Sequence, residues 1–361
     1  MSVTKEKYRN HIISKLRELD LSDEQIQPIV PVLIDRTDFL NGVVSFDSPI
    51  FSYKEKVIQS AELMGVKKDQ FVRAALKQPS LFYQSPKTLN SNVEGSTELM
   101  GITKDQFVRA ALKRPSLFTQ SPATLNSNVE GSTELMGITK DQFVPAALKH
   151  APLFTQSPAT LNSNVEGSAE LMGITKDQFV RAALKRPQLF YQLPETLNSN
   201  VEGSTELMGI TKNELVRAAL KNPALFYQSP ETISRHAALM NKMAEKNLVP
   251  ESVEDYYLNN PFLLSLADNN FHLRMVFALH QSLENHDNFS LLKTNRKTIE
   301  RNFAEALGHD PDVKTVTEPR PLNVDINSKE LQNLRILIAN IKNGLLKSYQ
   351  YKPDENSSLD L

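Results

Sequence analysis

The sequence predicts an all-α protein: an α-solenoid of helix–helix repeats, about 36 residues each, with a helical C-terminal cap. Blocks 65–100 and 101–136 are identical at 31 of 36 positions, and each block starts at one of a series of evenly spaced glycines: Gly65, Gly101, Gly137, Gly173 and Gly209. The pattern fades toward both ends, as expected of a solenoid, whose terminal units must present polar outer faces. No segment sustains the alternation of apolar and polar residues that marks a strand.

Each block begins with a short helix. In the second block, Thr103 and Gln106 have the spacing of a capping box. Arg109 and Lys113 are four residues apart and share the face opposite the apolar residues. Pro115 prevents the helix from continuing.

A longer second helix follows in each block. Ser121 is a suitable N-cap, and Pro122 suits the first helical position. Gly137 stands where a left-handed residue commonly ends a helix. Gly131 lies inside the helix and weakens it by up to about 1 kcal/mol relative to Ala. Its recurrence predicts a close approach by another helix.

The ends of the chain are organised differently. The amphipathic segment near the C-terminus carries apolar residues three and four apart, from Leu331 to Leu345. We expect it to seal the last repeat; the alternative is a helix that binds a partner or a second copy. The predicted segments are an N-terminal helical cap (1–44), the repeat solenoid (45–270), C-terminal helices (271–308), a linker (309–327), an amphipathic capping helix (328–350) and a disordered tail (351–361).

Composition excludes several classes of protein. The 361-residue chain contains no Cys, which excludes disulfides, thiolate zinc sites and cysteine nucleophiles. Its formal net charge of −1 excludes a uniformly basic coat but not a polarised one. No window approaches 18 apolar residues, and the first twenty residues lack the apolar core of a secretory signal. We therefore expect a cytoplasmic protein, the alternatives being secretion into a host cell or an organelle.

An enzyme is not expected. The nearest approach to a metal site is a group of histidines in the C-terminal third: His272, His280, His286 and His309. His272 and His280 are eight residues apart, which is two helical turns and too far for shared ligation. No nucleophile or phosphate-loop motif has distinguishing spacing. We predict no catalytic residue, no cofactor and no metal.

Charge is segregated within each block. The second helices carry glutamates four apart, such as Glu130 and Glu134, and the first helices carry cations. Stacking would align these groups into an acidic stripe and a basic stripe, and a basic stripe can follow a phosphate backbone. The alternatives are cations that only complement helix dipoles, or a site for an acidic protein. The candidate nucleic-acid contacts are Arg73, Lys77, Arg109, Lys113, Arg114, Lys149, Arg181, Lys185, Arg186, Arg217 and Lys221.

The repeats differ mainly at three sets of positions. These sets are 78/114/150/186/222, 83/119/155/191/227 and 87/123/159/195/231. They are interpreted either as a one-unit-one-base code or as neutral drift at exposed positions. The third block also carries Pro145 in place of an arginine, so we expect a local kink and a gap in the basic stripe.

The repeat unit resembles that of the mitochondrial transcription termination factor (mTERF) family over about residues 45 to 270. The matching stretches run from Leu76 to Phe82, Leu112 to Phe118, Leu184 to Phe190, Leu220 to Phe226 and Leu258 to Leu264. This resemblance implies a curved solenoid of helix–helix–3₁₀ units that binds duplex DNA or RNA through a basic concave face, without catalysis. The alternative function is a protein-interaction scaffold, including a secreted effector of an intracellular bacterium.

Overall fold

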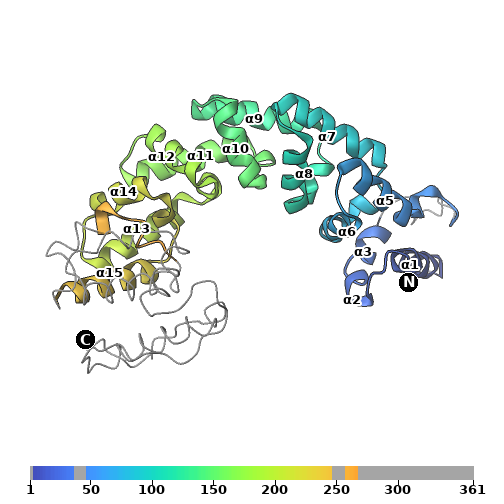
Figure 1. The fold of residues 1–361 in the computed structure, drawn as a ribbon, viewed down its shortest axis with the longest axis horizontal. Coiled ribbons are helices and arrows are strands. Elements are labelled where there is room, and N and C mark those ends of the chain that lie inside the picture. The colour runs from blue at the N-terminus through green and yellow to red at the C-terminus, as the bar shows by residue number, and fades with distance from the viewer. Residues whose placement is uncertain (1–2, 36–45, 246–256, 267–361) are drawn as a thin grey trace, which may run out of the picture. The chain divides into compact units, whose positions relative to one another are not determined.

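The computed structural model describes residues 3–35, 46–245 and 257–266. Within these ranges the chain forms helices and no strand, which confirms the all-α class (Figure 1). The segments predicted over 271–308, 309–327, 328–350 and 351–361 lie outside the described residues.

Each block folds into the same three elements in the same order. These are a ten-residue helix, a short 3₁₀-helix and a helix of at least 15 residues. The first helices are α6 Lys68–Lys77, α8 Lys104–Lys113, α10 Lys140–Lys149, α12 Lys176–Lys185 and α14 Lys212–Lys221. The 3₁₀-helices are η2 Pro79–Phe82, η3 Pro115–Phe118, η4 Ala151–Phe154, η5 Pro187–Tyr191 and η6 Pro223–Phe226. The second helices are α7 Pro86–Met100, α9 Pro122–Met136, α11 Pro158–Met172, α13 Pro194–Met208 and α15 Pro230–Glu245. Before the blocks come α1 Val3–Arg17, α2 Asp23–Ile26, α3 Val30–Ile34, η1 Pro49–Phe51 and α5 Tyr53–Met64.

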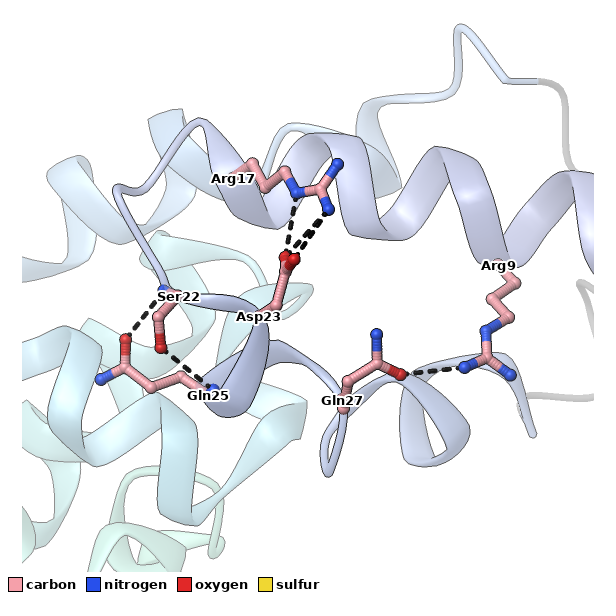
Figure 2. A network of polar contacts seen from close by, with 6 residues as sticks. All are labelled: Arg9, Arg17, Ser22, Asp23, Gln25 and Gln27. Atoms are coloured by element: carbon pink, nitrogen blue, oxygen red, sulfur yellow. Dashed lines mark hydrogen bonds and ion pairs between the residues drawn. The ribbon is translucent and has the colours of Figure 1, made fainter.

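A polar network joins the N-terminal helices (Figure 2). The Arg17 guanidinium donates from Nε and Nη2 to Oδ1 of Asp23, at 3.1 and 2.9 Å, and so ties the end of α1 to the start of α2. Ser22 closes a capping box on α2, while Arg9 donates to Oε1 of Gln27 at 2.9 Å. Ile12 and Leu16 of α1 are fully buried.

The described helices belong to two compact units. The first comprises residues 1–170 and 174–193, and the second comprises residues 171–173 and those from 194 onward. In the first unit α5 and the second helices α7 and α9 pack side by side, and the first helices α6, α8, α10 and α12 each pack on the next (Figure 1). This two-layer stacking is the solenoid arrangement. In the second unit α13 packs against both α14 and α15.

Aromatic rings join consecutive repeats through the core. Phe107 of α8 lies with its ring centroid 6.5 Å from that of Phe154, which belongs to the 3₁₀-helix of the next repeat. The same contact recurs one repeat later between Phe143 and Phe190, at 6.1 Å. All four rings are fully buried. Each phenylalanine buries apolar surface that a single repeat could not cover alone, which is why the repeats are stable only when stacked.

A ladder of asparagine hydrogen bonds accompanies the rings. Asn128 Nδ2 on α9 donates to the backbone oxygen of Phe154 at 3.0 Å, and Asn164 makes the same bond to Phe190 at 3.2 Å. These bonds satisfy carbonyl groups at the ends of the 3₁₀-helices, which the helices themselves leave unpaired.

The glycines have the two roles predicted from the sequence. Gly137 ends α9 with φ at +66°, the left-handed conformation. Gly131 lies where α9 meets the first residue of α11, because a Cβ on it would lie 2.9 Å from Cγ of Pro158. The close approach inferred from Gly131 is therefore confirmed, and the neighbouring group is a proline ring at a helix start.

The kink expected at Pro145 does not interrupt the helix. The α10 helix covers the same ten positions as its counterparts and ends at His150 with φ −131° and ψ 83°, the values found at Gln78. The His150 amide still donates to the oxygen of Ala146 at 3.0 Å. Proline removes one donor and leaves the last turn of α10 intact.

Candidate nucleic-acid interface

The structure exposes all eleven candidate cations. They project from the first helices or from the residue directly after them, opposite the buried face formed in α8 by Phe107, Ala110 and Ala111. The amphipathic pattern of the sequence therefore correctly predicts that these side chains are exposed. The candidates differ, however, in what they contact.

The last residue of four of the five first helices is a lysine without a side-chain partner among the described residues. We call Lys77, Lys113, Lys149 and Lys185 the lysine row; all four belong to the first unit, at equivalent positions of helices that pack successively on one another. None has a hydrogen-bond or ion-pair partner among the described residues. In the second unit the equivalent Lys221 donates to Oδ1 of Asn259 at 3.0 Å. In the described part of the chain, the row is therefore a set of unpaired positive charges, one in each of four consecutive repeats.

Of the four arginines one turn earlier, Arg109 and Arg181 are paired, whereas Arg73 and Arg217 have no ion-pair partner among the described residues. Arg109 forms an ion pair with Asp105, and Arg181 pairs with Asp177 at 2.8 Å, each within its own helix. Both pairs are exposed, and such pairs contribute about 0–1 kcal/mol. A phosphate can therefore compete for these arginines. Pro145 leaves the third block without one, so the expected gap in this set is present.

Arg114 has a structural contact that the sequence did not suggest. Its Nε donates to Oγ1 of Thr155 in the next repeat at 3.1 Å. The equivalent Arg186 is exposed. Arg114 is therefore shared between the surface and the joint between two repeats.

A second series of lysines, missed in the sequence, holds the repeats together. Lys140, the first residue of α10, donates to the oxygen of Leu99 at 2.7 Å and to Oδ1 of Asn126 at 2.8 Å. It thereby joins three helices, α7, α9 and α10. A signal was available, because a lysine in the first turn opposes the helix dipole and needs a specific partner to be favourable there.

These lysines also neutralise half of the predicted acidic stripe. Lys176 binds Glu166 at 2.8 Å, and Lys212 binds Glu202 at 3.2 Å. A hydrogen bond from Lys176 lowers the pKa of Glu166, and hydrogen bonds from Asn198 and then Lys212 lower the pKa of Glu202. Only the second glutamate of each pair stays exposed without an ion-pair partner in the described part of the chain: Glu98, Glu134, Glu170 and Glu206.

Two other kinds of site are not seen in the described residues. These residues hold no group of three or more acidic or histidine side chains suited to a metal ion. No helix among them combines the length and apolar character needed to cross a bilayer. The four C-terminal histidines considered above lie outside the described ranges.

Fold and surface together define a tandem helical-repeat protein with a row of lysines that have no partner among the described residues. Residues 2–172 match the mTERF family model, so this part of the chain is mTERF-like. The block 173–208 differs from block 101–136 at only four positions, so the same unit continues beyond the matched region. No curated protein matches the chain.

Proposed function

We propose that this protein binds nucleic acid, as double-stranded DNA or RNA, and that the lysine row contacts the phosphate backbone. The observation that carries this proposal is the row itself: exposed lysines at one position per repeat, with no partner among the described residues. The mTERF match supports the same class of ligand and a non-enzymatic role.

The spacing of the row suits a regular polyanion. Packed helices lie roughly 8–10 Å apart, and duplex DNA rises about 3.4 Å per base pair. The distance from one repeat to the next therefore corresponds to about three base pairs along a duplex. Phosphate contacts of this kind position a protein on a duplex but carry little sequence information, so we expect weak sequence preference.

The test compares two triple variants of the full chain. In the first, Lys113, Lys149 and Lys185 are replaced by Gln. The control replaces Lys7, Lys54 and Lys87, which are exposed lysines outside the row, so both variants lose the same charge. Fluorescence anisotropy with labelled duplex DNA, duplex RNA and single strands gives the affinities.

We expect the row variant to bind a duplex at least tenfold more weakly than the control. Equal losses in the two variants would show that only net charge matters. Absence of binding by the unmodified protein at low salt would refute the nucleic-acid proposal.

A protein-interaction scaffold is the second candidate, and one observation favours it. The second helices expose a leucine near their C-terminal ends, with Leu99 and Leu135 each 43% accessible. Each follows an exposed glutamate, Glu98 or Glu134. Leu99→Ser with Leu135→Ser should abolish capture of a protein partner without changing duplex affinity if this surface is the functional one.

A further inference from the structure

Near-identical repeats raise the question of what their few differences do. At two joints between repeats, members of two of the three variable sets contact each other. Arg114, in the set at the end of the first helix, donates to Thr155, which belongs to the set after the 3₁₀-helix of the following repeat. The two positions are 41 apart in sequence, one repeat plus five residues.

The next joint pairs the same two positions with different chemistry. The His150 ring stacks on the Tyr191 ring, with centroids 4.5 Å apart and planes only 6° from parallel. Both side chains are half-buried, so the stack excludes water from part of each ring. Nε2 of His150 is buried and has no hydrogen-bond partner among the described residues.

A third joint, in the second unit, involves only the first of these two positions, because the partners there do not belong to a variable set. Asn222 occupies the position of Arg114 and His150, and its Nδ2 donates to the oxygen of Pro261 at 3.2 Å and to Oγ of Ser265 at 2.5 Å. The partners again belong to the segment that follows in the stack. Three joints thus use a hydrogen bond, a ring stack and an amide–hydroxyl bond.

The third variable set behaves differently. Ala123, Ala159 and Glu195 are exposed at the start of second helices, and within the described residues they form no hydrogen bond or ion pair with another repeat. The side chains that vary at these positions therefore form no such contact with another variable position within the described residues. Within the described residues, contact between variable positions is therefore seen only between the first two sets, at the Arg114 and His150 joints; Gln78 instead donates to Oγ of Ser80 in its own repeat at 3.0 Å.

We propose that these residues are junction pairs that set how consecutive repeats stack, and so fix the spacing of the lysine row. They are not a base-reading code. Lys149 and Lys185 lie directly before the junction positions 150 and 186, so any change in stacking at His150 and Tyr191 moves one lysine relative to the other. The stacking claim does not depend on the proposed nucleic-acid function.

The first experiment is a double-mutant cycle in the full chain. His150→Gln and Tyr191→Thr each place the residue found at the equivalent position of an earlier repeat. Each single change should lower the folding equilibrium constant by about three- to tenfold, because it removes the stack. The double change should cost no more than the larger single change. Additive losses would overturn the pairing.

The second experiment measures spacing directly. The chain has no native cysteine, so Lys149→Cys and Lys185→Cys allow specific spin labelling. The distance distribution between these labels should broaden or shift in both single variants, while labels at positions 77 and 113 should not respond. Glu195→Ala, a variable position outside the pairs, should leave both distributions unchanged. Unchanged 149–185 distances in the two junction variants would refute the spacing claim.

The third readout separates stacking from ligand reading. The two junction variants should alter absolute duplex affinity without changing the ratio of affinities for two duplexes of different sequence. A changed ratio would show that the variable positions read bases and would overturn the proposal. If no duplex binds at all, the cycle and the distances still decide whether the pairs control stacking.

Discussion

Gly131→Ala gives the sharpest test of the packing between second helices. In an isolated helix this change is favourable by about 1 kcal/mol, because Ala has the higher helix propensity. Here the new methyl group would lie 2.9 Å from Cγ and 3.2 Å from Cβ of Pro158. Contacts below 3.0 Å require the helix or the ring to shift.

The two effects have opposite signs, and their magnitudes decide the result. Overpacking in a well-packed site costs about 1–3 kcal/mol. The proline ring is rigid and begins α11, so relief requires movement of α11 itself. We therefore expect a net loss of about 1 kcal/mol, where propensity alone predicts a gain of the same size.

Urea unfolding followed by circular dichroism measures this loss, and hydrogen exchange of α9 and α11 locates it. Pro158→Ala removes Cγ, so Gly131→Ala should cost less in that background than in the native chain. Ser127→Ala, at an exposed position of the same helix, serves as the control and should be neutral or slightly stabilising. A stabilised Gly131→Ala variant would refute the close-approach argument.

Three further changes test other parts of the account. Pro145→Ala should stabilise the protein by up to about 3 kcal/mol, because it restores a helix donor at an exposed position; thermal unfolding measures the gain. Asn128→Ala should cost about 1 kcal/mol by leaving the Phe154 oxygen unbonded, and it should speed hydrogen exchange in η4. Burial, reinforced by Arg114, lowers the pKa of His150. The unfolded chain therefore binds this proton more readily than the folded chain does. The free energy of unfolding should fall as the pH drops from about 7.5 through 6.5, and it should level off below the pKa that His150 has in the folded protein. His150→Gln should reduce that fall in a series of melting temperatures against pH, and an unchanged profile would contradict the assignment.

Local signals in the sequence were sufficient for the repeat unit. The capping box at Thr103 and Gln106, the N-cap at Ser121 and the left-handed Gly137 all act within a few residues of themselves. Their physics is short-range, so spacing alone predicts them. Pro145 shows the limit, because a strong local signal for a kink is opposed by packing on both sides of α10.

The candidate site was predictable in its exposure but not in its partners. Helical periodicity placed Arg109, Lys113 and their equivalents on the solvent face. It could not show that Arg114 bonds to Thr155, because that contact depends on how two repeats meet. The anchoring role of Lys140 was missed for the same reason, since its partners lie on two other helices.

The salt dependence of duplex binding tests the central claim most directly. If the lysine row contacts phosphates, log K should fall linearly with log salt, with a slope of about −0.9 per phosphate neutralised. Replacing Lys113, Lys149 and Lys185 by Gln should make that slope shallower by about 2.7, while the control triple variant should keep it. An identical slope in the row variant would show that these lysines do not touch the backbone, and would contradict the proposed interface.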